Sequence, residues 1–307
     1  MTTTATFSYS GIIGSASRTT MSTYQTDVLR IMHDINAQQF TAQDVMATVN
    51  EARRKICSDT GCLRALDTIV LATNQESYQY GTIPAVFVGN GGSGYTNPTI
   101  TFSGGNPLVN ATATVQYSGG VITGITMTNV GSGFDPTVAN PIVMTLTDPS
   151  GVGASLTFGC ISANCLALLG FNVIYTQERW TLDWAPWSDF SVRWRYWTNW
   201  QQRPAIWSQY GQSGFYIAPL PDLNYISEVD TLIIPDDLMD YTTTDPIALI
   251  YQAPIKWYAA YLLKQKEQSF NDANWFLQQY HQRLMEIFNE TTPRLIPSHY
   301  QDNGRWQ

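Results

Sequence analysis

Three glycines near the middle of the chain have the spacing of a dinucleotide-binding motif. They occur as Gly89-x-Gly91-x-x-Gly94 within the stretch GNGGSGYTNPT, residues 89–99. In the nucleotide-binding motif such glycines open a helix whose N-terminus holds a pyrophosphate. Here Pro98 disfavours helical geometry at Asn97, and the residues that follow alternate between apolar and polar types. We therefore expect a turn that leads into a strand, and no nucleotide site.

The same glycine-rich element returns 39 residues later. Asn90 begins N-G-G-S-G-Y and Asn129 begins N-V-G-S-G-F, and a proline follows each copy. The second copy lacks the G-x-G-x-x-G spacing, so a phosphate cradle is not what recurs. Residues 111–115 and residues 154–158 show a weaker similarity at a comparable offset. This pattern predicts two short β repeats, with glycine where the turns need a positive φ.

Cysteine and histidine give no sharp catalytic or metal site. The four cysteines form two Cys-x4-Cys pairs, Cys57/Cys62 and Cys160/Cys165. Because x2 spacing is more usual for zinc, we favour buried thiols, with a metal site or disulfides as the alternatives. The three histidines belong to no Ser-His-Asp, Cys-His or H-E-x-x-H arrangement. We expect no catalytic residue, no cofactor and no metal, and hence no enzyme.

Seven of the ten tryptophans lie between Trp180 and Trp207. Three nearby carboxylates suggest a glycosidase, which needs two acids beside aromatic platforms, but helix capping and turns explain these acids more simply: Glu178, Asp183 and Asp189. Aromatic and arginine side chains can also stack on single-stranded nucleic acid. In an acidic chain we favour a protein–protein interface instead. The predicted subunit or tail interface consists of Trp194, Tyr196, Trp197, Trp200 and Trp207.

The composition limits the classes of partner. The 307 residues carry a formal net charge of −8, which argues against a surface whose main activity is nucleic-acid binding. Only 13% of the residues are charged, against an ordinary value of about 25%. Because the chain also holds 10 Trp, 17 Tyr and 12 Phe, we expect part of its surface to be buried against other chains. No signal peptide and no membrane-spanning segment is expected.

The pattern of elements predicts an α+β fold. Helical spacing after Ser22 and after Thr41 predicts two N-terminal helices, and a further helix is expected from Asp245 to about Lys264 with a kink at Pro254. A closing helix is expected from about Asn271, followed by a tail at 291–307. We predict that the N- and C-terminal helices pack as a helical bundle beside a small antiparallel β region.

One segment stands apart by composition. Between Ala85 and Ser150 there is no Lys, no Arg and no Glu. We interpret residues 83–158 as an inserted all-β domain that carries the two repeats. It interrupts a core formed by residues 1–82 and 159–307.

The chain without this insertion resembles the head-to-tail adaptor (connector) proteins of tailed bacteriophages. Motifs over about 230 residues carry the resemblance through their order, since none is sharp alone. They are VNEARRKIC (49–57), TIVLATNQESYQY (68–80), NVIYTQERWTLDWAPWSDF (172–190), RPAIWSQYGQSGFYIAPLPDLNY (203–225), IIPDDL (233–238) and DPIALIYQAPIKWYAAYLLKQKEQ (245–268). The insertion departs from the compact family pattern.

The resemblance implies a structural virion protein at the head–tail junction, assembled in the host cytoplasm. Such adaptors form a ring beneath the portal protein, typically twelvefold, which extends the DNA channel and docks a nozzle or tail-tube protein. DNA would pass without specific binding, and residues 83–158 could contact tail fibres. A C-terminal segment commonly reaches between portal subunits, so we expect a portal-binding tail at Leu295, Ile296, Tyr300 and Trp306. The alternative is a carbohydrate-binding or host-adhesion virion protein that uses the β insertion.

Overall fold

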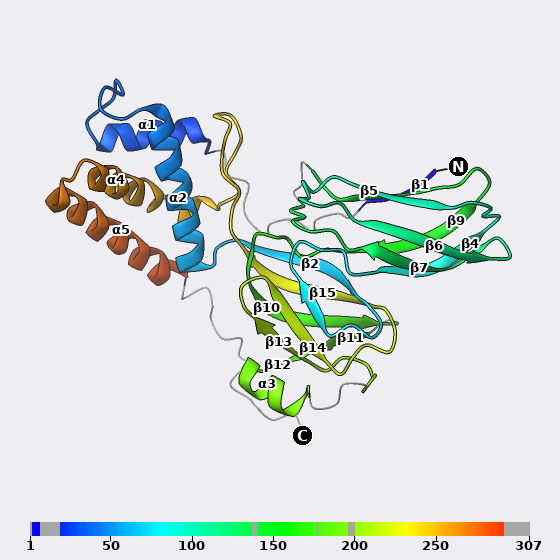
Figure 1. Ribbon diagram of the computed structural model, residues 1–307. Helices are drawn as coiled ribbons and strands as arrows, with labels where there is room; N and C mark the ends of the chain where they lie inside the picture. The colour runs from blue at the N-terminus through cyan, green and yellow to red at the C-terminus, as the bar shows by residue number, and fades with distance from the viewer. Residues whose placement is uncertain (1, 7–18, 137–139, 177, 196–199, 292–307) are drawn as a thin grey trace. The chain divides into compact units, whose positions relative to one another are not determined.

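The computed structural model describes residues 2–6, 19–136, 140–176, 178–195 and 200–291 (Figure 1). The chain divides into two compact units. The β unit comprises Met1–Ile13 and Arg64–Ile234, and the helical unit comprises Gly14–Leu63 and Pro235–Gln307. Each unit is described by itself below.

The predicted fold class is wrong in the proportions of helix and strand. The structure is mostly β, with 36% strand and 28% helix, so an α+β class with extensive sheets fits and a helical bundle at the termini does not. The physical reason is that many strands pair only over long range. Arg64 and Asp230, for example, lie on adjacent strands although 166 residues separate them. Local periodicity does not reveal such partners.

In the helical unit, α4 packs against α5 and α2, and α1 packs against α2 and α4. The α2 helix begins where the Thr41 side chain accepts a hydrogen bond from the Asp44 amide, and it ends at Gly61 with a φ of 60°. The helices are α1 (Met21–Ile31), α2 (Ala42–Thr60), the 3-10 turn η1 (Leu249–Tyr251), α4 (Ile255–Lys266) and α5 (Phe270–Thr291).

The helix expected from Asp245 starts ten residues late, at Ile255. Asp245 does accept the capping-type hydrogen bond from the Ile247 amide at 3.1 Å, but its carboxylate also binds Arg53 Nη2 at 2.8 Å, and only the 3-10 turn η1 follows before α4. Pro254 then takes the N-cap position, where its missing N–H costs nothing. The expected kink at Pro254 is therefore a helix start.

Two four-stranded sheets share one hydrophobic core in the β unit. The first has the order β11-β10-β15-β2 and the second has the order β12-β13-β14-β3. Phe171 and Phe215, from opposite sheets, meet in this core with their ring centroids 5.3 Å apart. The strands are β2 (Arg64–Leu71), β3 (Ser77–Gln79), β10 (Cys165–Tyr175), β11 (Glu178–Thr181), β12 (Asp183–Trp184), β13 (Ile206–Tyr210), β14 (Gly214–Ala218) and β15 (Tyr225–Ile233).

The charge-poor segment folds around a core of its own, in which all buried residues fall between Ile83 and Cys160. Its strands are β4 (Val86–Ser93), β5 (Thr99–Ser103), β6 (Thr112–Ser118), β7 (Val121–Asn129), β8 (Val143–Thr147) and β9 (Val152–Phe158). The strand expected after Gly94 is present as β5. The N-terminal strand β1 (Thr2–Thr6) joins this segment by pairing with β8.

The two repeats exchange strands. The first strand of the first repeat, β4, pairs with the last strand of the second, β9, while β7 pairs in the same way with β6. The registers agree residue by residue, because Asn90 lies opposite Ser155 and Asn129 lies opposite the equivalent Thr112. Both pairs also shift register at the residue before the asparagine. The middle strands β5 and β8 pair with each other, with Thr101 opposite Thr145.

The repeated sequence element explains this equivalence. In each copy the asparagine side chain accepts a hydrogen bond from the amide two residues on, at 2.9 Å in both Asn90–Gly92 and Asn129–Gly131. Gly92 and Gly131 have φ values of 64° and 70°, which glycine adopts without strain. The aromatic residue that ends each copy, Tyr95 or Phe134, is buried. The element is therefore a turn that places one core residue per repeat.

Deletion of residues 83–158 tests whether they form a separable domain. Val86 lies opposite Phe158 in the β4–β9 pair, so the ends of the segment are neighbours and a short Gly/Ser linker can join them. We expect the deletion variant to melt cooperatively and to retain its helical circular dichroism. An insoluble product without a cooperative transition would show that the segment belongs to the main core.

Asp67 gives a pH-dependent prediction. Its carboxyl lies inside β2, fully buried, and its Oδ2 accepts a hydrogen bond from Thr231 Oγ1 at 3.0 Å. Burial raises its pKa to about 6, against the opposing effect of the hydrogen bonds from Thr231 and Ser162. The unfolded chain has a pKa of about 3.9, so the folded state binds the extra proton between about pH 4 and pH 6. Protonation of Asp67 therefore stabilises the folded state by up to about 3 kcal/mol, and this contribution is lost as the pH rises through this window.

Replacement of the group by Asp67→Asn should remove this dependence. We expect the variant to gain stability relative to the wild type as the pH rises from 4 to 7. Urea unfolding of both proteins at several pH values measures the difference. Parallel stability curves for the two proteins would contradict the assignment.

Candidate functional site

An aromatic surface surrounds the short helix α3 (Trp187–Arg193) beside the second sheet. Pro186 takes the N-cap position of this helix, and Phe190 is its buried anchor. The Trp187 ring packs against Tyr210 of β13 and Tyr216 of β14, with centroids 4.3 and 4.8 Å apart. The helix α3 and the strands β13 and β14 thus hold these three aromatic side chains in contact.

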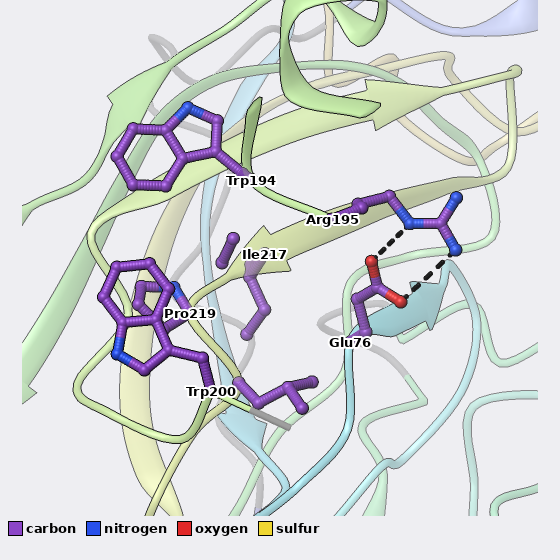
Figure 2. A pocket seen from close by; sticks show the side chains of 8 residues that line it. Glu76, Trp194, Arg195, Trp200, Ile217 and Pro219 are labelled. Atoms are coloured by element: carbon purple, nitrogen blue, oxygen red, sulfur yellow. Dashed lines mark hydrogen bonds and ion pairs between the residues drawn. The ribbon is translucent and has the colours of Figure 1, made fainter. Parts of the chain in front are cut away.

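Arg195 links this group to a distant part of the chain. Its guanidinium carbon lies 5.4 Å from the Trp187 ring centre and 5.2 Å from that of Tyr216. Its Nε donates to Glu76 Oε1 at 2.5 Å, as the dashed lines in Figure 2 show. The hydrogen bond to Glu76 raises the pKa of Arg195, so the charge is permanent at any relevant pH.

Two further rings lie beside this ion pair. Trp194 and Trp200 are stacked, with centroids 6.3 Å apart and planes within 13°. Together with Ile217, Pro219 and the Arg195–Glu76 pair they line a small cavity of about 90 Å³ (Figure 2). The hollow is too small for a large ligand, but it suits the insertion of one apolar side chain.

A larger hollow adjoins it. Its volume is about 590 Å³, and it shares Trp194, Trp200 and Pro219 with the small cavity. Arg203, on its wall, lies 3.6 Å from the ring centre of Trp180. Arg195 and Arg203 are thus both stacked on aromatic rings, an arrangement typical of interfaces.

Much of this aromatic area is open to solvent. The most exposed rings among them are those of Tyr210 (52%), Tyr175 (44%), Trp200 (40%) and Trp180 (39%). Large rings are usually well covered in a folded chain, and a group of exposed rings is the kind of patch that is common at interaction sites. The aromatic surface is defined as the rings connected by these contacts and hollows together with the two arginines that lie on them: Tyr175, Trp180, Trp187, Trp194, Arg195, Trp200, Arg203, Tyr210 and Tyr216.

The structure brings together only part of the predicted interface. Trp194 and Trp200 meet, whereas Trp207 is 3% exposed and packs on Phe171 inside the sheet core. Trp207 therefore stabilises the fold and contributes no exposed surface. The remaining predicted residues lie outside the described part of the chain: Tyr196, Trp197, Leu295, Ile296, Tyr300 and Trp306.

Sequence reasoning placed Arg195 and Arg203 with the tryptophans but missed Glu76, which orients Arg195 from 119 residues away. The pairing of β14 with β3 brings the segment of Glu76 beside the second sheet, and no local sequence signal reveals this.

The cysteines are free thiols. Cys57 Sγ and Cys62 Sγ lie 3.5 Å apart, at hydrogen-bond distance and without a disulfide bond, and Cys160 and Cys165 are buried. Over the described residues, no group of three or more His, Cys, Asp or Glu side chains is arranged to hold a metal ion.

A scan of protein-family models and a search of curated proteins found no match to this chain. Within the described residues, no helix has the length and apolar character needed to cross a bilayer.

Single substitutions should separate surface from core among the tryptophans. Trp200→Ala should change the free energy of unfolding by less than about 1 kcal/mol, because its ring is well exposed. Trp207→Ala should cost about 3–5 kcal/mol, since it leaves a cavity between the sheets. Thermal unfolding of both variants measures the contrast. Equal losses would show that Trp200 belongs to the core.

Proposed function

We propose that this protein is a head-to-tail adaptor of a tailed bacteriophage virion. The observation that carries the proposal is the aromatic surface, in which stacked rings and ring-bound arginines surround two hollows. Rings and arginines held in this way suit a protein partner, because such residues supply most of the energy at protein–protein interfaces. The motifs at residues 172–190 and 203–225, which resemble those of adaptors, form most of this surface.

An oligomeric ring of copies would explain both the exposed aromatic side chains and the negative net charge. In such a ring, each subunit would bury its aromatic surface against a neighbouring subunit or a tail component. The net charge of −8 suits a channel through which DNA must slide without being held. The partners in this proposal are the portal protein, further copies of the chain in a ring of about twelve, and a nozzle or tail-tube protein. The location is the head–tail junction of the virion.

Two regions complete the proposal. The segment at 292–307 carries Leu295, Ile296, Tyr300 and Trp306, and it would reach between portal subunits. At about 1.5–3 kcal/mol for each large apolar side chain, their burial would offset the cost of ordering the segment. The insertion at 83–158 would face outward, toward tail fibres.

The test is sedimentation of the purified protein with rings of the portal protein from the same virus. We expect the full chain to sediment with the rings. A chain truncated after Thr292 should keep its melting temperature and lose portal binding. A Trp200→Glu variant should bind the portal and fail to complete a ring or to recruit the tail protein.

The control is Thr114→Lys, which changes an exposed residue of β6 away from the aromatic surface. A full chain that stays off portal rings at every concentration would overturn the adaptor proposal. Glycan binding by the purified protein that disappears in the 83–158 deletion variant would favour the adhesion alternative.

A further inference from the structure

The C-terminal cap of α2 brings two cysteines into contact. Gly61 lies in the left-handed region, and its amide donates to the Cys57 carbonyl oxygen at 2.8 Å, which ends the helix. In a cap of this type, the side chain of the residue that accepts this bond often contacts the side chain of the residue after the glycine. These two positions are held by Cys57 and Cys62, whose Sγ atoms lie 3.5 Å apart. The capping geometry therefore explains why a Cys-x4-Cys pair meets here.

The two thiols differ in access and in acidity. Cys57 is 3% exposed, whereas Cys62 is half-buried and can be reached from solvent. The hydrogen bond from Cys57 lowers the pKa of Cys62, while the same contact together with burial raises the pKa of Cys57. The thiolate is the nucleophile in thiol–disulfide exchange. Cys62 is therefore suited to attack first, and Cys57 is suited to resolve the product.

The other Cys-x4-Cys pair has the same spacing in a different setting, because it spans the connection between β9 and β10 instead of a helix end. Cys160 Sγ donates to the Ile161 carbonyl oxygen at 3.2 Å. Cys165 Sγ donates to the Ala167 carbonyl oxygen at 3.6 Å. Both thiols are buried, and burial raises the pKa of each. This pair serves as an internal control for the effect of the cap.

We propose that Cys57 and Cys62 form a reversible dithiol–disulfide pair that low-molecular-weight disulfides oxidise. The Cys62 thiolate attacks one sulfur of the small disulfide and expels one small thiolate, which leaves a mixed disulfide on Cys62. Cys57 then loses its proton and attacks Cys62 Sγ, and the second small thiolate leaves. In total the two cysteines lose two electrons and two protons, and the small disulfide is reduced to two thiols.

The position of Cys62 allows this bond to form while the helix stays intact. The sulfur atoms must approach each other from 3.5 Å to about 2.05 Å. Cys62 lies beyond Thr60, the last residue of α2, so it can shift without breaking a helical hydrogen bond. The chain would carry two thiols in a reducing compartment and a covalently closed cap in an oxidising one. This inference does not depend on the adaptor proposal.

The test is a redox titration of the purified full chain in glutathione buffers that run from fully reduced to fully oxidised. After acid quenching the chain is unfolded, alkylated and digested with trypsin, which releases both cysteines in one peptide, ICSDTGCLR, residues 56–64. We expect this peptide to carry two alkyl groups in reduced buffer. In oxidised buffer it should carry none and have the mass of the internal disulfide, and dithiothreitol should reverse the change. Cys160 and Cys165 should be alkylated at every glutathione ratio.

Serine variants separate the roles of the two thiols. Cys57→Ser should stop at the mixed disulfide between Cys62 and glutathione. Cys62→Ser should stay unmodified in the native chain, because Cys57 is buried. Cys165→Ser is the matched control and should form the disulfide as the wild type does. The oxidised wild type should melt about 2–4 °C above the reduced form, and Cys62→Ser should lack this shift.

Three results would overturn the proposal. One is a peptide 56–64 that carries two alkyl groups even after the folded chain has stood in fully oxidised glutathione. Another is a disulfide that joins Cys57 or Cys62 to a different cysteine or to a second chain. The third is a Cys160–Cys165 disulfide that forms at the same glutathione ratio, which would show that the cap has no special effect. The peptide analysis uses the wild-type chain, so it decides the question even where a serine variant does not fold.

Discussion

A buried ion pair between distant parts of the chain holds the helical unit together. Arg53 of α2 and Asp245 are 1% and 0% exposed, and their nearest atoms lie 2.8 Å apart. Tyr24 of α1 donates to the same carboxylate at 2.6 Å, and Arg53 donates to the Asp236 carbonyl at 2.7 Å. Loss of one partner would leave a buried unpaired charge, at a cost of about 3–5 kcal/mol. The pair thus joins the segments that precede and follow the β unit, whose entry and exit strands β2 and β15 are paired neighbours.

The insertion is also held together by contacts between segments that are distant in the sequence, but here strand pairing takes the place of an ion pair. Neither repeat is complete alone, because its first strand pairs only with the last strand of the other repeat. The exchange places apolar residues from both repeats in one core. This explains how a segment without Lys, Arg or Glu between Ala85 and Ser150 can fold.

Local sequence signals predicted the features that depend on local interactions. The Thr41 cap and the strand after Gly94 are confirmed, since each depends on a few neighbouring residues. The helix start expected at Asp245 was wrong: Asp245 caps the Ile247 amide, but its carboxylate also holds Arg53, 192 residues away, and α4 begins only at Ile255. The tryptophan run predicted an interface but could not separate Trp200 from Trp207. That distinction depends on which face of β13 meets the other sheet, and the pairing partners that decide it are remote in sequence.

The aromatic surface is fixed before any partner arrives. Phe190 is fully buried and packs on Trp187 and Tyr216, and the Glu76 carboxylate holds Arg195 over these two rings. Side chains held in this way lose little conformational entropy when they are covered, so more of the free energy of apolar burial contributes to binding. A surface of mobile rings would lose part of that gain to ordering. The sheet core around Trp207 and Phe171 therefore serves the proposed interface indirectly, by keeping the exposed rings in place.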